Sequence, residues 1–302
     1  MTTRSRSWNN PNDLDLQTKM ELTLAHSPDA DDAFMFYALA TGKVNPGTYH
    51  FSHFLADIET LNRAAAEGRY DVTALSVFGY AFVADKYVLL ESGGSIGDGY
   101  GPIVVGRDQL LCEDLRIRPI AVPGTRTTAF LALSLWLGSA PNYIEVPFDR
   151  ILEAVRQGQW AGQPVDAGLI IHEGQLSYED EGLLALVDLG NWWKKQTGLP
   201  LPLGVNAIRR SLGPRVHADV AELLRQSVLY AREHPEEALS YAAQFGRGLS
   251  RERLRRFVDM YVNDSTVRIP PEARKAIELL LSEAAKARLI EQLVQPEFAQ
   301  GS

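Results

Sequence analysis

A histidine stands where a buried strand is predicted to end. His172 follows the apolar run 167–171, Ala-Gly-Leu-Ile-Ile, and precedes Glu173. Such a run is typical of a parallel strand buried on both faces, and open α/β sheets bind ligands at the carboxyl ends of their strands. An imidazole titrates near neutral pH, so we predict that His172 transfers protons, with Glu173 or another carboxylate orienting it. The alternative is a histidine that is only hydrogen-bonded at a strand end.

A glycine turn followed by a helix start is a candidate anion site. The run 122–130 reads Val-Pro-Gly-Thr-Arg-Thr-Thr-Ala-Phe. Its hydroxyls, its guanidinium and the free amides of a helix N-terminus suit a carboxylate or another oxyanion. We therefore predict that Arg126 and the amides of Thr127, Thr128 and Ala129 hold an anionic part of a substrate. The alternative is that Thr127 only caps the helix.

Three aspartates gather in a turn near the N-terminus. Asp29, Asp31 and Asp32 belong to the run 26–34, His-Ser-Pro-Asp-Ala-Asp-Asp-Ala-Phe. Carboxylates bind hard cations, but acidic side chains also favour the first turn of a helix, where they cap amides and complement the dipole. We prefer the second interpretation and predict no metal site.

Composition narrows the class of protein. The chain has 302 residues, a net charge of -8 and 45% hydrophobic residues. This charge argues against nucleic acid or an anionic membrane as the main partner. Cys112 is the only cysteine, so no intrachain disulfide is expected. Without a run of about 18 apolar residues or a secretory signal, we expect a cytoplasmic protein.

Short apolar runs alternate with helical patterns from Glu21 onward, which predicts an α/β protein with mostly parallel sheets. The expected strands are 22–25, 49–55, 72–75, 103–106, 117–122, 143–146, 167–171 and 184–189. Helices are expected at 57–67, 127–137 and 149–158, each stopped by a glycine. After about Ile208 only helices are expected, at 218–233, 235–245, 251–262 and 271–289.

Two Pro- and Gly-rich crossings, near 99–102 and 199–204, bracket a central block of strands. They predict two lobes with a site between them. We expect a disordered tail at 1–20, a discontinuous first lobe at 21–105 plus 207–302, and a second lobe at 106–206.

Longer segments around these residues carry a family resemblance. They are 149–152 (Asp-Arg-Ile-Leu), 168–173 (Gly-Leu-Ile-Ile-His-Glu), 187–193 (Val-Asp-Leu-Gly-Asn-Trp-Trp) and 197–204 (Thr-Gly-Leu-Pro-Leu-Pro-Leu-Gly), with shorter matches at 57–63, 92–94 and 127–129. The chain closely resembles the 1,4-dihydroxy-6-naphthoate synthase family of the futalosine route to menaquinone, from Glu21 to its end.

This resemblance implies a two-lobed fold of the type II periplasmic-binding-protein kind, with a ligand cleft between the lobes and a helical C-terminal segment. It implies a lyase that converts cyclic dehypoxanthine futalosine into 1,4-dihydroxy-6-naphthoate with loss of a three-carbon fragment and without a cofactor. The family's proposed proton acceptor maps onto His172. Its substrate contacts map onto Leu75 and Ser76 on one lobe and onto Thr128 and Ala129 on the other.

The chain departs from the family pattern at two places. Relatives typically read Ser-Pro-Cys-Pro-Asn-Asp-Thr-Phe where residues 27–34 read Ser-Pro-Asp-Ala-Asp-Asp-Ala-Phe, and Ala74 stands where a lysine commonly precedes the Leu-Ser pair. Ala74 therefore belongs to the predicted substrate site without supplying that cation. These two places are expected to decide how the substrate meets His172.

Two other functions fit the same broad fold. A cytoplasmic binding protein for a small anion would need no base. The chorismate dehydratase of the same pathway is similar in fold, but the Ile-Ile-His-Glu and Asn-Trp-Trp strings match the naphthoate synthase better. Turnover of cyclic dehypoxanthine futalosine, turnover of chorismate or binding without turnover would distinguish the three.

Overall fold

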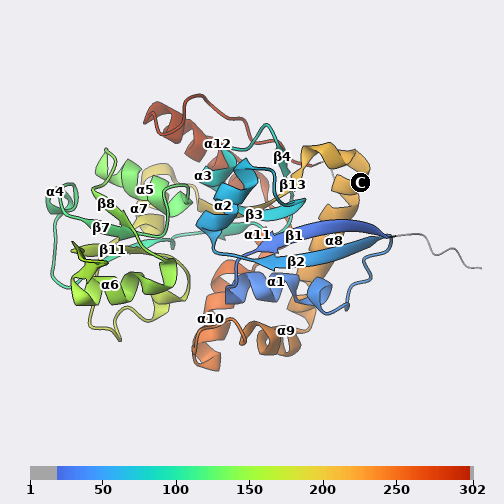
Figure 1. The fold of residues 1–302 in the computed structure, drawn as a ribbon, viewed down its shortest axis with the longest axis horizontal. Helices are drawn as coiled ribbons and strands as arrows, with labels where there is room; N and C mark the ends of the chain where they lie inside the picture. The colour runs from blue at the N-terminus through green and yellow to red at the C-terminus, as the bar shows by residue number, and fades with distance from the viewer. Residues whose placement is uncertain (1–18, 300–302) are drawn as a thin grey trace, which may run out of the picture.

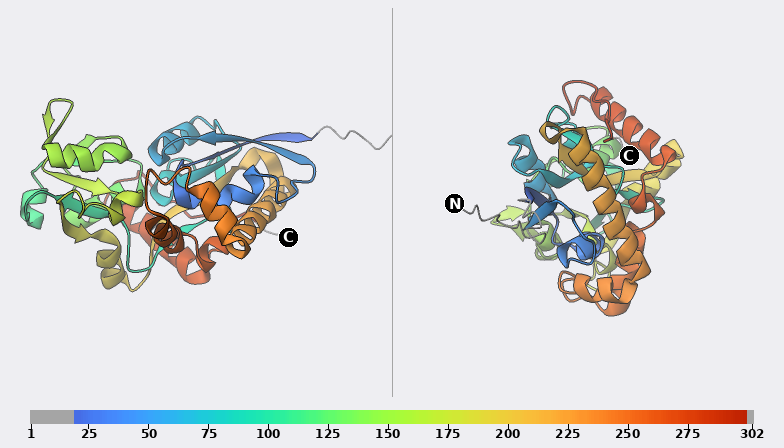
Figure 2. Two further views of the ribbon diagram at one scale, coloured as in Figure 1. Left: turned by 90° about the horizontal axis from the view of Figure 1, so that it is seen from below. Right: turned by 90° about the vertical axis from the view of Figure 1, so that its right-hand side faces the viewer.

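The computed structural model describes residues 19–299 and shows two α/β halves, each built on its own sheet (Figure 1). Most of the predicted tail lies outside the described residues, but its last residue, Met20, already belongs to the first strand. Figure 2 shows the half with the second sheet, in green, lying beside the larger blue and orange half. Within 19–299, no helix is both long and apolar enough to cross a membrane.

The first sheet has the strand order β2-β1-β3-β13-β4, and β5 also pairs with β13. Its strands are β1 (Met20–His26), β2 (Tyr49–Leu55), β3 (Val72–Ser76), β4 (Tyr87–Leu89), β5 (Ser95–Gly97) and β13 (Leu201–Arg209). The first three are parallel, whereas β13 runs antiparallel to its neighbours.

The second sheet has the order β12-β6-β11-β7-β8. Its strands are β6 (Ile103–Gly106), β7 (Ile120–Val122), β8 (Tyr143–Glu145), β11 (Ala167–Ile170) and β12 (Leu184–Asp188). A small hairpin, β9 (Gln159–Trp160) with β10 (Gln163–Pro164), stands apart from it. Here β11, β7 and β8 are parallel, and β6 is antiparallel to both of its partners.

Two sequence expectations need correction. The sheets are mixed rather than mostly parallel, because the chain passes between them through β6 and β13, which run opposite to the βαβ strands. The expected crossing at 199–204 is largely part of β13, a strand that Pro202 and the preceding Pro200 concealed. The expected lobe boundaries at 105/106 and 206/207 therefore fall inside strands, since β6 pairs in the second sheet and β13 in the first.

The helices follow local signals in the sequence. In the first half of the chain they are α1 (Ala30–Ala40), α2 (Ile58–Ala66), α3 (Val77–Tyr80), α4 (Cys112–Leu115), α5 (Thr128–Leu137), α6 (Ile151–Gln157) and α7 (Leu189–Thr197). Asp57 caps α2 by accepting from the Thr60 amide. Left-handed glycines end α5 and α6 at Gly138 and Gly158, as the sequence predicted.

The C-terminal segment is helical, also as predicted. Its helices are α8 (Gly213–Glu233), α9 (Pro235–Ala242), α10 (Arg251–Tyr261), α11 (Asp264–Val267) and α12 (Pro271–Lys286). The first three of these pack against α1, while α12 packs against β13 and α3. Short 3-10 turns complete the chain: η1 (Phe148–Arg150), η2 (His172–Leu176) and η3 (Arg210–Leu212).

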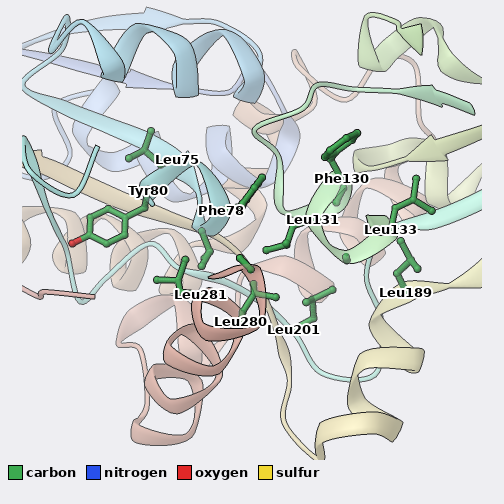
Figure 3. Packing of buried hydrophobic residues seen from close by; sticks show 14 of the residues in the cluster. Leu75, Phe78, Tyr80, Phe130, Leu131, Leu133, Leu189, Leu201, Leu280 and Leu281 are labelled. Atoms are coloured by element: carbon green, nitrogen blue, oxygen red, sulfur yellow. The ribbon is translucent and has the colours of Figure 1, made fainter. Parts of the chain in front are cut away.

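One buried apolar cluster joins the two halves (Figure 3). Leu75 and Phe78 enter it from the first sheet side, and Leu131 and Leu189 enter it from the helices of the second. Separate clusters fill the first half around α1 and the second half around α6. The halves are therefore in firm apolar contact along one side.

Candidate active site

A cavity between the two sheets collects the residues predicted from the sequence. Seven of them line it: Ala74, Leu75, Ser76, Thr127, Thr128, Ala129 and His172. Asp29, Asp31 and Asp32 also line it, whereas no Lys or Arg among the described residues does. The cavity therefore has an acidic end and an end made of hydroxyls and amides.

His172 sits at the carboxyl end of β11, where the apolar run predicted it. The side chain is 16% exposed, and Nε2 has no hydrogen-bond partner among the described residues. Its backbone has a φ of 62°, in the left-handed region that a non-glycine residue adopts only at a cost. The Phe148 ring packs edge-on against the imidazole, with 4.7 Å between centroids. The ring is thus held in place, and its buried Nε2 is left without a partner among the described residues.

Asp29, in the other half of the molecule, orients this imidazole. Its Oδ2 lies 2.9 Å from Nδ1 of His172, and the carboxylate is only 1% exposed. Ser27 donates its hydroxyl hydrogen bond to the same oxygen. A carboxylate on Nδ1 fixes the tautomer in which Nε2 can accept a proton. Asp29 and His172 together form a dyad that is completed only when the two halves meet.

The dyad has strongly shifted pKa values. Burial acts to lower the pKa of His172, but the charge and hydrogen bond of Asp29, with the charges of Glu173 and Asp31, outweigh it and raise the pKa to about 9. Burial acts to raise the pKa of Asp29, but His172 and Arg247 hold it well below its ordinary value. The resting dyad is therefore an ion pair at neutral pH.

The aspartate turn was interpreted from the sequence as helix capping, which is correct only in part. Asp29 occupies the N-cap position of α1 without a side-chain cap hydrogen bond and instead faces His172. Asp32 accepts from the Ser27 amide at 2.8 Å. Burial and Asp29 raise the pKa of Asp31 to about 7, and Asp31 Oδ1 has no partner among the described residues. Within those residues, no group of three or more His, Cys, Asp or Glu could hold a metal.

The opposite end of the cavity is the start of α5. Thr127 caps the helix, accepting from the Phe130 amide at 3.1 Å and donating to the Gly124 carbonyl at 2.9 Å. This cap leaves the first-turn amides of Thr128 and Ala129 without intrahelical partners, and both residues line the cavity. The helix start thus lies at the cavity, and anion binding by its amides stays a prediction.

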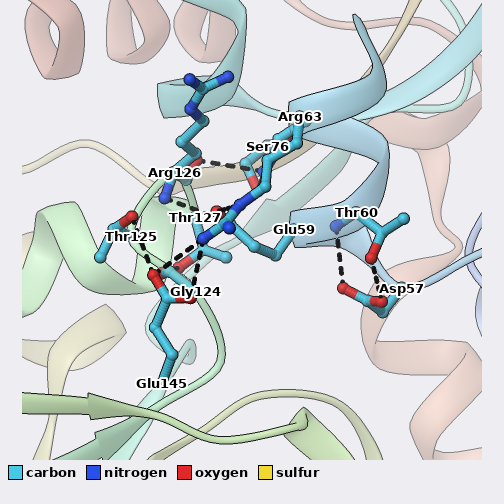
Figure 4. A network of polar contacts seen from close by, with 11 residues as sticks. Asp57, Glu59, Thr60, Arg63, Ser76, Gly124, Thr125, Arg126, Thr127 and Glu145 are labelled. Carbon is cyan, nitrogen blue, oxygen red and sulfur yellow. Dashed lines mark hydrogen bonds and ion pairs between the residues drawn. The ribbon is translucent and has the colours of Figure 1, made fainter. Parts of the chain in front are cut away.

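Arg126 does not line the cavity, where the sequence had predicted its guanidinium to hold an anion. Its guanidinium is over the Phe82 ring, 5.3 Å from the centroid, and the side chain extends away from the neighbouring carboxylates (Figure 4). The Arg126 amide donates to Glu59, at 2.9 Å, and its carbonyl accepts from Asn62. The residue therefore fixes the loop through its backbone, and its charge is not among the groups that line the cavity.

Several site residues were missed from the sequence. Asn206 pairs in register with Ala74 across β13 and β3, and its Oδ1 is buried without a partner in the described chain. Tyr261 donates to Gln175 at 3.0 Å, and both line the cavity. Asn206 was hidden because β13 was not predicted. Tyr261 was predicted only as part of an amphipathic helix.

Comparison with known proteins places this site in a family. Residues 22–286 match a family model described as menaquinone biosynthesis. The chain belongs to this family. A 1,4-dihydroxy-6-naphthoate synthase of Thermus thermophilus is 45% identical to this family member over 279 residues, which cover 92% of this chain and 98% of that protein. The resemblance found in the motifs is therefore confirmed.

Solved structures confirm the fold of this family member. A crystal structure of an Archaeoglobus fulgidus protein is similar with a TM-score of 0.84 and 47% identity, covering 89% of this chain and 98% of that one. The alkanesulfonate-binding protein of Xanthomonas axonopodis pv. citri is similar with a TM-score of 0.67 and 16% identity, covering 91% and 96%. The second likeness shows the predicted periplasmic-binding-protein-like fold and nothing about ligand.

Proposed function

We propose that this menaquinone-biosynthesis protein is a carbon–carbon lyase that converts cyclic dehypoxanthine futalosine into 1,4-dihydroxy-6-naphthoate, in the cytoplasm and without a cofactor. His172 is the general base of this reaction. The observation that carries the proposal is the dyad, because Asp29 holds Nδ1 while Nε2, on a residue that lines the cavity, has no partner among the described residues. A binding protein for a small anion has no need of such an arrangement.

The two ends of the cavity suit the two ends of this substrate. The carboxylate of the aromatic part binds the hydroxyl and amide end at Ser76, Thr128 and Ala129. The sugar-derived hydroxyls then lie at the acidic end, beside His172 and Asp31. The absence of a cation at Ala74 is offset in this pose, since the carboxylate is held at α5 rather than on the first sheet.

The reaction follows from this pose. His172 Nε2 accepts a proton from a sugar-derived hydroxyl, that oxygen forms a carbonyl, and the neighbouring C–C bond breaks in a retro-aldol manner. The electron pair released from that bond passes to a carbonyl group conjugated with it, and the enolate so formed takes the proton back from His172. Aromatisation of the new ring favours the products. General-base catalysis of this kind contributes roughly 10²–10⁴-fold. The remainder comes from orientation of the substrate in the cavity.

The test compares the wild type with His172→Gln. Purified protein is incubated with cyclic dehypoxanthine futalosine or, separately, with chorismate, and products are identified by mass spectrometry. We expect 1,4-dihydroxy-6-naphthoate from the first substrate only. The variant is expected to lose at least about 10²-fold in turnover while calorimetry shows substrate binding within a few-fold of the wild type.

Three outcomes would contradict the proposal. Turnover of chorismate indicates the dehydratase, and tight binding of substrate without turnover by the wild type indicates a binding protein. Near-normal turnover by His172→Gln shows that another group is the base.

A further inference from the structure

Arg247 lies outside the cavity and contacts four residues around the dyad. Arg247 lies between α9 and α10, with a backbone φ of 45°. Its Nη1 donates to Glu173 Oε2 at 2.7 Å, and its Nη2 lies 2.7 Å from Asp29 Oδ1 and 3.2 Å from the carbonyl oxygen of Pro28. Its guanidinium also covers the Phe148 ring, 4.5 Å from the centroid.

Each of these neighbours bears on His172. Asp29 pairs with Nδ1 through Oδ2, and Arg247 holds the other oxygen of the same carboxylate. Phe148 lies between the guanidinium and the imidazole, and packs against both. Glu173 follows His172 in the chain and accepts weakly from the Ala30 amide, at 3.4 Å, as well as from Arg247. Arg247 is absent from the residues that line the cavity, so it acts through these groups.

The charges explain why a cation is needed there. Asp29 and Glu173 are 1% and 7% exposed, and they come from different halves of the molecule. Two buried carboxylates so close together repel each other and would separate the halves or take up a proton. A guanidinium offers a rigid fork that binds both carboxylates at once, which an ammonium does not.

We propose that Arg247 is a positioning residue, which holds Asp29 against His172 and joins the two halves around the completed dyad. This inference rests on the proposed role of His172. The strained backbone at both His172 and Arg247 fits a site where packing fixes the conformation.

The experiment compares Arg247→Met with Arg253→Met. Both changes remove an arginine that pairs with a carboxylate of the other half, but Arg253 pairs with Asp180 and does not contact the dyad. Proton NMR of the full chain is recorded for the downfield Nδ1 proton of an imidazole that donates to a buried carboxylate. The signal is assigned by its loss in His172→Gln. Steady-state kinetics with cyclic dehypoxanthine futalosine is the second measurement.

We expect the Nδ1 signal in the wild type and in Arg253→Met, and its loss in Arg247→Met. We also expect kcat to fall at least tenfold in Arg247→Met, with KM changed less than threefold, and Arg247→Lys to recover only part of the loss. Retention of the signal in Arg247→Met, or equal kinetic losses in both methionine variants, would overturn the proposal. Since the NMR signal needs no substrate, a failed assay of the proposed function leaves this test intact.

Discussion

At the scale of single residues, Asp29 both orients His172 and changes its pKa. As the proposed general base, His172 must be neutral to act, yet Asp29 raises its pKa to about 9. The wild-type protein is therefore expected to gain activity as the pH rises through the alkaline range. Asp29 thus supplies orientation and basicity together, at the expense of the neutral fraction near pH 7.

Asp29→Asn tests whether Asp29 sets the pKa and the orientation of His172. Without the carboxylate, burial dominates and the pKa of His172 falls below its ordinary value of 6.5, as it does for the buried His26, at about 4. The acidic limb of the kcat/KM profile should move from about pH 9 to below pH 6.5. The plateau should fall by roughly 10²-fold or more, because an amide does not fix the tautomer. An unchanged limb would contradict the dyad, and Asp85→Asn, at an exposed aspartate, is the control.

Asp31→Asn tests whether the ionised Asp31 carboxylate destabilises the folded protein. The folded state keeps the Asp31 proton up to about pH 7, while an unfolded aspartate loses it near its model value of 3.8. The folded state therefore binds more protons within that window, and stability falls as the pH rises through it. We expect Asp31→Asn to raise Tm at pH 8 by roughly 2–4 °C and to leave it unchanged at pH 3. Equal shifts at both pH values would exclude this cause; calorimetry measures them, with Asp85→Asn as the control.

At the scale of elements, the contact between α2 and the loop before α5 positions the end of the cavity formed by the start of α5. Glu59 on α2 accepts from the Arg126 amide, and Arg63 of the same helix binds both Glu59 and Glu145 of β8 (Figure 4). Gly124 permits this approach. Its φ is 146°, and a Cβ there would lie 2.3 Å from the Glu59 side chain.

Gly124→Ala should displace this loop. We expect a loss of stability of about 1–3 kcal/mol from overpacking, together with an increase in KM of at least fivefold because the amides of α5 move. The matched control is Gly138→Ala at the other end of α5, where φ is 72° and a Cβ meets open space. That variant should lose about 1 kcal/mol with unchanged KM. A similar KM for both variants would show that the loop position does not matter; thermal melts and steady-state kinetics decide.

At the scale of the whole molecule, both apolar and polar contacts join the two halves. The shared cluster around Leu131 and Phe78 is buried, while the Arg247 and Arg63 groups cross near the ligand site. The halves are therefore held together by apolar burial as well as by charged groups.

The shared cluster predicts that the halves unfold together. All four described tryptophans lie between 136 and 193, in the second half, whereas the long helices lie in the first. Thermal transitions followed by tryptophan fluorescence and by far-ultraviolet circular dichroism should therefore coincide. Leu131→Ala should lower both midpoints equally, with a loss of about 2–5 kcal/mol. Separate midpoints would show that each half unfolds alone.

Local patterns in the sequence determined the strand ending at His172, the caps of α2 and α5 and the helical C-terminal segment, because apolar periodicity and capping act over a few residues. The sequence motifs around His172 also indicated the family. Only the tertiary structure decided that β13 is a strand, because its one proline, Pro202, is tolerated through pairing with distant neighbours. It alone decided that Asp29 faces His172 rather than capping its own helix, and that Arg247 pairs with both Asp29 and Glu173, because these contacts exist only where the two halves meet.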